Sequence, residues 1–245
     1  MREDLTVLAA RIKGAERLTI LTGAGVSAAS GVPTFRGPDG LWRRHRPEDL
    51  ATPAAFGRDP RLVWEWYAWR RELIAACRPN AAHHVIAAWS QRDGCRVVTQ
   101  NVDDLHLQAG TRGLVRMHGS IWELSCWGRC ASGVTPWRDD RVPMTVLPPP
   151  CPHCGRVTRP AIVWFGESLR PEDLDAAVRA ADCDLFLTVG TSSLVYPAAS
   201  LVHAARQHGA FTAEINLEET SASAAVDIAI HGSAEQILPA IAQLL

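Results

Sequence analysis

Residues 17–28 decide the fold, and they read RLTILT followed by GAGVSA. The first six residues have the pattern of a buried strand, and the glycines after them permit a tight turn into a helix. Short apolar runs at 96–99, 184–189 and 211–215 also end in polar or glycine-rich residues, with helical patterns between several of them. This alternation predicts an α/β protein built on a Rossmann-like, doubly wound parallel sheet.

Polar or glycine-rich clusters follow four of these predicted strands, at the carboxyl ends where ligands of such sheets gather. The clusters are 23–27, 100–103, 190–193 and 216–218. The glycines of the first cluster would let a diphosphate approach backbone N–H groups, although a purely structural turn is the alternative. No acidic residue follows this turn after about 20 residues, which counts against a hydride-transferring dehydrogenase. The ribose contact would come instead from the last cluster, through Asn216 and Glu218.

Two stretches interrupt the alternation of strands and helices. Residues 41–84 look helical and rich in tryptophan, and Asp59 and Pro60 open a helix with an apolar stripe made of Leu62, Trp66, Trp69 and Leu73. Residues 120–159 lack helical periodicity. We expect these two insertions to form a smaller domain. The larger, Rossmann-like domain would then consist of residues 1–40, 85–119 and 160–245.

Four of the seven cysteines form two close pairs, C-x3-C and C-x2-C, at Cys126, Cys130, Cys151 and Cys154. Four thiolates in two pairs suit a tetrahedral zinc ion with no open coordination position, and hence a structural role. The alternative is that the longer first spacing strains or abolishes the site and leaves oxidisable thiols. The remaining cysteines are expected to be small buried side chains: Cys77, Cys95 and Cys183.

The composition limits the classes of function and location. A formal charge of −1 over 245 residues gives no long-range attraction to nucleic acid or to an anionic membrane, so we expect neither as a direct partner. No apolar run approaches the roughly 20 residues of a membrane span, and the first residues do not resemble a secretory signal. The close cysteine pairs suit a reducing compartment, which makes the cytoplasm the expected location. A monomer is the expected oligomeric state.

Two further features have both a plain and a functional interpretation. Residues 30–37 have the composition of a surface loop, but their glycines and Phe35 also suit a lid that excludes water. Tyr67 and Arg70 lie three residues apart and share one face of the tryptophan-rich helix. They are either a solvated polar flank or a clamp that binds a carboxylate through charge-assisted hydrogen bonds.

Residues 99–103 end a predicted strand with two amides and a carboxylate, which can hydrogen-bond a carboxamide and a ribose in one pocket. A capped helix start explains the carboxylate of Asp103 equally well. His118 follows another apolar run and is either a structural histidine or a general base. The second role rests on an ordinary pKa near about 6.5, at which an imidazole accepts a proton around neutrality.

Seven motifs follow one another along nearly the whole chain: 23–37, 99–103, 118–119, the four cysteines, 163–167, 190–192 and 216–218. Each motif is weak alone, but the ordered set is specific. Together they resemble the motif set of the sirtuins. This resemblance implies an NAD-binding Rossmann domain, a smaller zinc-bearing domain and an acyl-lysine tunnel in the cleft between them.

The resemblance also implies a role for each matched residue. The general base would be His118, with Asn101 as the second catalytic residue, and the four cysteines would bind one structural zinc ion. The substrate peptide would be added as a strand, and the acyl-lysine held, by Tyr67, Arg70, Val163, Phe165, Gly166, Glu167, Val195 and Tyr196. The contacts to NAD would come from Gly23, Ala24, Gly25, Ser27, Ala28, Pro33, Thr34, Phe35, Arg36, Trp42, Gln100, Asn101, Asp103, Gly190, Thr191, Ser192, Asn216, Leu217, Glu218, Ser233 and Ala234.

The reaction implied by the resemblance removes an acyl group from a lysine of another protein or peptide and consumes NAD as a co-substrate. The acyl oxygen attacks the nicotinamide ribose carbon and expels nicotinamide. His118 then helps to activate a ribose hydroxyl, and water releases the lysine and an acylated ADP-ribose. Such chemistry needs a pocket that restrains water until the ribose is captured, which suits a lid carrying Phe35.

Two details of the sequence bear on the acyl group. Most sirtuins read Pro-Asp-Phe-Arg where this chain has PTFR at 33–36, and the pair Tyr67 and Arg70 matches the class III branch. That branch removes succinyl, malonyl and glutaryl groups, which end in a carboxylate. The sequence therefore favours the clamp and predicts desuccinylation and demalonylation, with weaker deacetylation. The alternatives are a plain deacetylase, an ADP-ribosyltransferase that uses the same NAD pocket, and a non-catalytic interaction module.

Overall fold

The computed structural model describes residues 2–35, 41 and 46–245, so the expected contacts of Arg36 and Trp42 lie outside the described residues. Its larger sheet has the strand order β3-β2-β1-β7-β8-β9, and every neighbouring pair is parallel. The strands are β1 (Leu18–Thr22), β2 (Cys95–Thr99), β3 (Leu114–Arg116), β7 (Leu185–Val189), β8 (Phe211–Asn216) and β9 (Ile228–His231). β1 and β7 are buried at every position, as parallel strands covered on both faces must be. The predicted doubly wound sheet is confirmed.

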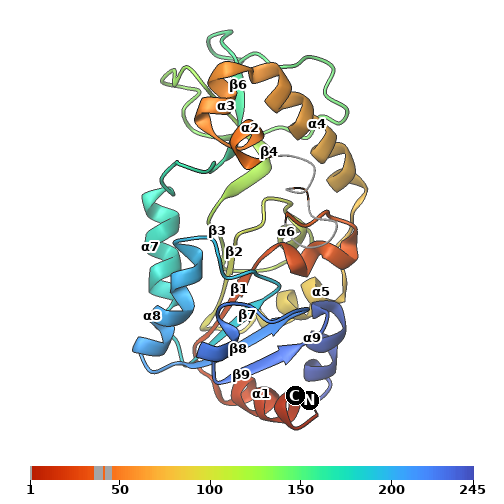
Figure 1. Ribbon diagram of the computed structural model, residues 1–245, viewed down its shortest axis with the longest axis vertical. Helices are drawn as coiled ribbons and strands as arrows, with labels where there is room; N and C mark the ends of the chain where they lie inside the picture. The colour runs from red at the N-terminus through yellow and green to blue at the C-terminus, as the bar shows by residue number, and fades with distance from the viewer. Residues whose placement is uncertain (1, 36–40, 42–45) are drawn as a thin grey trace.

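Helices cover both faces of this sheet (Figure 1). They are α1 (Arg2–Gly14), α5 (Ala81–Trp89) and α9 (Ala234–Ala242) on one face, and α7 (Pro171–Ala180) and α8 (Leu201–Gln207) on the other. The core under the first group includes Ile12, Ile86 and Leu238. The core under the second includes Ala177 and Leu201. No helix among the described residues is long and apolar enough to cross a bilayer.

The strand order changes direction between β1 and β7, because the chain continues from β1 to β2 on one side and adds β7 on the other. Ligands of doubly wound sheets bind outside the carboxyl ends of the strands at such a switch point. Short helical turns follow the strands at this edge. They are η1 (Ala24–Ser30) after β1, α6 (Leu105–Gln108) after β2, η3 (Ala198–Ser200) after β7 and η4 (Ser223–Ala225) after β8.

A second, antiparallel sheet lies beyond this edge, in the upper part of Figure 1. Its order is β5-β4-β6, made of β4 (Gly119–Cys126), β5 (Trp137–Arg138) and β6 (Thr158–Ile162). It packs with α2 (Pro47–Leu50), α3 (Pro53–Arg58) and α4 (Pro60–Ala76) around a core that includes Phe56, Trp64 and Leu124. Both insertions therefore contribute to this smaller part. Helix α5 and strand β6 run across the expected boundaries at residues 85 and 160.

Helix α4 begins where the sequence predicts, since the Asp59 carboxylate accepts a hydrogen bond from the Leu62 N–H at 2.9 Å. Its predicted apolar stripe is correct for Trp66, which is buried, but wrong for Leu62 and Trp69, which are 47% and 41% exposed. The buried residues of α4 include a neighbouring stripe made of Val63, Tyr67, Arg70 and Ile74. The two stripes differ by one residue, a rotation of about 100° around the helix. The prediction selected the most apolar side chains, whereas the buried face of α4 includes a phenol and a guanidinium.

Candidate active site

A cavity of about 880 Å³ lies at the switch point, between the carboxyl ends of the parallel strands and the smaller part of the molecule. Among the expected site residues, those that line it are Gly23, Ala24, Gly25, Ala28, Thr34, Phe35, Tyr67, Arg70, Gln100, Asn101, His118, Val163, Phe165, Gly166, Glu167, Gly190, Thr191, Ser192, Val195, Tyr196, Asn216, Leu217, Glu218, Ser233 and Ala234. Ser27, Pro33 and Asp103 are described but do not line it. Residues far apart in the chain thus meet around one space.

Three glycines bring the turns after β1 and β7 into direct contact. The Gly25 N–H donates to the Gly190 carbonyl at 2.8 Å. A Cβ on Gly23 or on Gly25 would lie 2.8 Å from backbone atoms of Gly190 or Thr191, and Gly190 itself has a φ of +60°. Side chains are excluded here because the two backbones touch. The cavity wall at this point is therefore bare main chain, which is the surface that a diphosphate approaches most closely.

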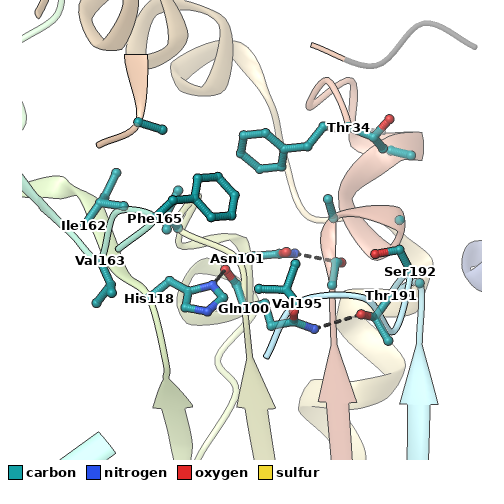
Figure 2. A pocket seen from close by; sticks show the side chains of 18 of the residues that line it. Thr34, Gln100, Asn101, His118, Ile162, Val163, Phe165, Thr191, Ser192 and Val195 are labelled. Carbon is teal, nitrogen blue, oxygen red and sulfur yellow. Dashed lines mark hydrogen bonds between the residues drawn. The ribbon is translucent and has the colours of Figure 1, made fainter. Parts of the chain in front are cut away.

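The amides at the end of β2 are held in place by hydrogen bonds (Figure 2). The Gln100 side chain donates to the Thr191 hydroxyl at 2.9 Å. The Asn101 side chain donates to the Gly23 carbonyl at 3.1 Å and to the Ser27 hydroxyl at 3.2 Å. These bonds connect the turns after β1, β2 and β7. They fix two carboxamides at the floor of the cavity, where they can hydrogen-bond polar groups of a ligand.

Asp103 lies beneath this floor rather than in the cavity. One carboxylate oxygen accepts a hydrogen bond from the Ser27 hydroxyl at 2.8 Å, and the other accepts one from the Leu105 N–H at 2.9 Å, at the start of α6. Burial raises the pKa of Asp103 above its ordinary value, and both hydrogen bonds oppose that shift. One oxygen of Asp103 thus binds the start of α6, as the helix-start interpretation expects. The other oxygen holds the Ser27 hydroxyl, which in turn accepts a hydrogen bond from the Asn101 carboxamide.

His118 faces the cavity with a defined tautomer. Its Nδ1 lies 3.0 Å from the main-chain carbonyl oxygen of Gln100, as the dashed line in Figure 2 shows. A carbonyl only accepts, so Nδ1 carries the proton and Nε2 keeps its lone pair in the neutral ring. Burial lowers the pKa of His118 below its ordinary value, and the bond to Gln100 opposes this shift. The side chain is therefore a neutral base near pH 7.

Tyr67 and Arg70 line the cavity from α4 and are only 2% and 5% exposed, which rules out the solvated-flank interpretation. The Arg70 guanidinium carbon lies 4.8 Å from the centroid of the Phe35 ring and 4.9 Å from that of Trp66. No carboxylate of the described part of the chain lies within 4.0 Å of the Arg70 guanidinium. Burial lowers the pKa of Arg70, yet a guanidinium keeps its charge in proteins. Among the described residues, this cation is buried beside aromatic rings, faces the cavity and forms no ion pair, although it feels the charge of Asp103 beneath the cavity floor.

The substrate residues expected at 163–167 and 195–196 form the rim of the cavity. Phe165 is 43% exposed and Tyr196 is 72% exposed, so the rim is aromatic and open to solvent. The Val163 N–H already donates to the His118 carbonyl at 3.0 Å. Both carboxylate oxygens of Glu167 are taken by the guanidinium of Arg159, at 2.5 and 2.7 Å. Glu167 therefore holds the shape of the rim.

The four paired cysteines converge in the smaller part of the molecule. All four Sγ atoms lie within 4.8 Å of one another, with Cys126 to Cys154 at 3.6 Å and Cys130 to Cys151 at 3.8 Å. Zinc–sulfur bonds of about 2.3 Å in a tetrahedron place sulfurs about 3.8 Å apart, so this donor set fits one zinc ion. The extra residue of the first pair is accommodated by Arg129, which has a φ of +50°.

The longer spacing therefore does not exclude Cys130. A Cβ on the nearby Gly133 would lie 2.7 Å from the Cys130 Sγ, so a glycine is required beside the cluster. Because four thiolates fill a tetrahedral site, a zinc ion here would be structural. The other three cysteines are buried free thiols, as predicted: Cys77, Cys95 and Cys183.

Some cavity residues were missed by the sequence analysis. Trp66, Trp164, Leu169 and Leu174 also line the cavity. Trp66 was assigned to an apolar stripe, and Trp164 was passed over between two expected substrate residues. A signal was available for Trp164, because an indole with one polar N–H sits inside a motif that was otherwise assigned to substrate binding.

Comparisons with known proteins agree on one family. The model of the Sir2 family matches residues 23–197. The curated NAD-dependent protein deacylase 2 of Pyrobaculum aerophilum is 48% identical over 226 residues, which are 91% of this chain and 89% of the relative.

Two solved structures extend the comparison. The crystal structure of a Sir2 homolog–NAD complex has a TM-score of 0.90 and 41% identity, covering 97% of this chain and 93% of that chain. A Sir2 structure bound to a myristoylated histone peptide has a TM-score of 0.79 and 30% identity, covering 100% of this chain and 97% of that chain. The likeness extends over nearly the whole chain. By sequence and by structure, this chain belongs to the Sir2 family, the sirtuins.

Proposed function

We propose that this protein is an NAD-dependent protein lysine deacylase that removes succinyl and malonyl groups, and acetyl groups more weakly. The observation that carries the acyl preference is Arg70. Among the cavity-lining residues that the structure describes, it is the only lysine or arginine. A buried cation without an anionic partner is costly, and a ligand carboxylate would offset that cost with charge-assisted hydrogen bonds.

The cavity floor supports the use of NAD as a co-substrate. Bound NAD would supply a ribose carbon that the acyl oxygen of the modified lysine attacks as nicotinamide leaves. The bare main chain of Gly23, Gly25 and Gly190 suits the diphosphate, and the amides of Gln100 and Asn101 suit the nicotinamide and its ribose. The family's solved complex with NAD supports the same choice.

His118 is the proposed general base. Its Nδ1 is occupied by the Gln100 carbonyl at 3.0 Å, which leaves Nε2 to accept a proton from a ribose hydroxyl. Phe35 lines the same space and would exclude water while the reactive ribose awaits capture. The aromatic rim at Phe165 and Tyr196 would hold the flanking peptide, with proteins that carry acylated lysines as partners.

The acyl end of the cavity distinguishes a dicarboxylic acyl group from an acetyl group. A succinyl or malonyl chain ends in a carboxylate, which the planar guanidinium of Arg70 can bind in a bidentate manner. An acetyl group leaves the guanidinium buried and without that partner. The names of the relatives support deacylation in general, and the acyl preference rests on Arg70 and Tyr67.

The test is a panel of one peptide sequence carrying acetyl-, succinyl-, malonyl-, glutaryl- or myristoyl-lysine, incubated with the purified protein and NAD. Nicotinamide release gives kcat/KM, and mass spectrometry identifies the second product. We expect acylated ADP-ribose as the product and the largest kcat/KM values with succinyl and malonyl groups. A preference for acetyl or myristoyl peptides would refute the acyl assignment, and ADP-ribosylated protein as the main product would refute deacylation.

A matched pair of histidine variants checks the chemistry. His118→Ala should abolish nicotinamide release with every acyl group, because it removes the proposed base. His84→Ala, at an exposed position of α5, should leave release at the wild-type level. Equal activity of the two variants would rule out His118 as the base.

A further inference from the structure

The indole of Trp164 contacts the hydroxyl of Tyr67 from beneath the cavity rim. Its Nε1 lies 2.9 Å from the Tyr67 oxygen, and the Trp164 side chain is buried, with 2% of the residue exposed. An indole N–H can donate a hydrogen bond but cannot accept one. The direction of this bond is therefore fixed without knowledge of hydrogen positions, and the Tyr67 oxygen is the acceptor.

This direction determines what Tyr67 can offer to a ligand. Its single O–H proton points away from Trp164, and no acceptor in the described part of the chain receives it. Tyr67 and Arg70 line the same cavity and lie one helical turn apart on α4. The phenol therefore presents a donor to the space that the guanidinium also faces. Two donors, of which one is charged, are the complement of a carboxylate.

The Trp164 ring is itself held from two sides. The Arg159 guanidinium carbon lies 3.7 Å from the ring centroid, and Arg159 forms the two-bond ion pair with Glu167. The Glu167 carboxylate also accepts the main-chain N–H of Trp164 at 2.8 Å. Phe56 packs near the ring, with centroids 5.2 Å apart. The indole N–H consequently has one orientation, toward Tyr67.

We propose that Trp164 is a positioning residue for acyl specificity: it occupies the acceptor side of the Tyr67 hydroxyl, so that the phenol donates to the terminal carboxylate held by Arg70. This inference rests on the proposed function. Without the indole N–H, the phenol is free to turn, and its oxygen lone pairs then face the carboxylate for part of the time. A residue that only fills the core would not produce such acyl selectivity.

The test uses Trp164→Phe, which keeps an aromatic ring and removes the N–H. We expect the ratio of succinyl to acetyl kcat/KM to fall about five- to tenfold, as for the loss of one neutral hydrogen bond, mainly through the KM for the succinyl peptide. Tyr67→Phe should lower the ratio more than about tenfold, because it removes the charge-assisted hydrogen bond to the carboxylate itself. The double variant should lower it no further than Tyr67→Phe alone, because both changes remove one interaction.

Two other variants keep the inference testable. Trp127→Phe is the matched control, because Trp127 packs 6.3 Å from Trp164 but does not line the cavity, and it should leave the ratio unchanged. If Trp164→Phe does not fold, Arg159→Gln replaces it. That variant removes the cation over the indole from outside the cavity, and should lower the ratio in the wild-type background but not in Tyr67→Phe.

The outcomes separate this inference from the proposed function. Suppose that the wild-type protein removes succinyl groups, but Trp164→Phe lowers kcat/KM equally for the succinyl and acetyl peptides, or its effect on the ratio adds fully to that of Tyr67→Phe. Trp164 is then a core residue only, and the desuccinylase proposal stands. If the wild-type protein removes acetyl groups but not succinyl groups, the desuccinylase proposal fails and the inference fails with it. A selective, non-additive loss of succinyl turnover supports both.

Discussion

Replacing Arg70 with methionine should change the acyl specificity of this protein without lowering its thermal stability. In the free protein the guanidinium is 5% exposed, is surrounded by aromatic rings and has no carboxylate partner in the described part of the chain. Its desolvation cost is therefore balanced only in part, by cation–π contacts worth up to about 2 kcal/mol and by the charge of Asp103. Methionine has a similar length and no charge. We expect Arg70→Met to lose succinyl turnover and to keep its thermal stability.

The magnitude follows from the bonds that a succinyl group would make. A bidentate contact to a guanidinium is two charge-assisted hydrogen bonds, worth about 1.5–3 kcal/mol each. Their loss amounts to at least about 3 kcal/mol, and about 1.4 kcal/mol corresponds to a factor of ten. The ratio of succinyl to acetyl kcat/KM should thus fall at least a hundredfold. Since replacing a buried charge with an apolar group is often neutral or stabilising, the Tm should not fall.

The neighbouring arginine provides a matched control for this experiment. Arg71 is fully buried but points away from the cavity, and it pairs with Asp139 at 3.0 Å. Breaking a buried ion pair costs up to about 3–5 kcal/mol, or roughly 6–20 °C in Tm for a chain of this size, and Arg141, which also pairs with Asp139, reduces that cost. Arg71→Met should therefore lower the Tm and leave the acyl ratio unchanged. Equal losses on both substrates for Arg70→Met, or a large fall in its Tm, would refute the clamp.

Three further predictions concern the base, the metal and the buried histidines. Because burial lowers the pKa of His118, the acidic limb of kcat/KM should be centred below about 6.5. A limb centred above that value would contradict this prediction. Cys130→Ser should lower the bound zinc measured by elemental analysis and lower the Tm, while full zinc content would exclude Cys130 as a ligand. Burial lowers the pKa of His83 to about 4 and of His106 to about 3, so both stay neutral in the fold and gain protons first in the unfolded chain as the pH drops. The free energy of unfolding measured with urea should then be greatest above about pH 6.5. It should fall by about 1.4 kcal/mol per pH unit for each group, which is roughly 4 kcal/mol by pH 5. A free energy of unfolding that does not change with pH would contradict this prediction.

The parallel sheet and its ligand edge could be predicted because their signals are local. A strand buried on both faces is an apolar run, and a turn in which two backbones touch requires glycine. The strand predicted at 17–22 is observed as Leu18–Thr22, and the glycines beside it meet Gly190 as a switch point requires. The four zinc-binding cysteines could also be predicted, since metal ligands are constrained in type and spacing. The position of Cys130 in the cluster depended on the φ of Arg129, which spacing alone does not specify.

The buried face of α4 could not be predicted from its apolar pattern. Periodicity assigns burial to the most apolar stripe, but here Leu62 and Trp69 are exposed while Tyr67 and Arg70 are buried. Local rules fail in this way at functional sites, where a polar group is kept inside despite its cost. The hydrogen bond from Trp164 to Tyr67 joins positions 97 residues apart, so no local pattern could have indicated it.

The base and the acyl clamp belong to different parts of the molecule, so acyl specificity can change without a change in the pKa of the base. His118 is oriented by the carbonyl that ends β2, whereas Arg70 is carried by α4 on the smaller sheet. No hydrogen bond or ion pair of the described residues joins the two side chains, and the shift in the pKa of His118 arises from burial and from Gln100, without a contribution from Arg70. Groups that do not interact contribute additively. Arg70→Met should therefore lower succinyl turnover at every pH by the same factor, with the acidic limb of kcat/KM unmoved, and a displaced limb would show that clamp and base are coupled.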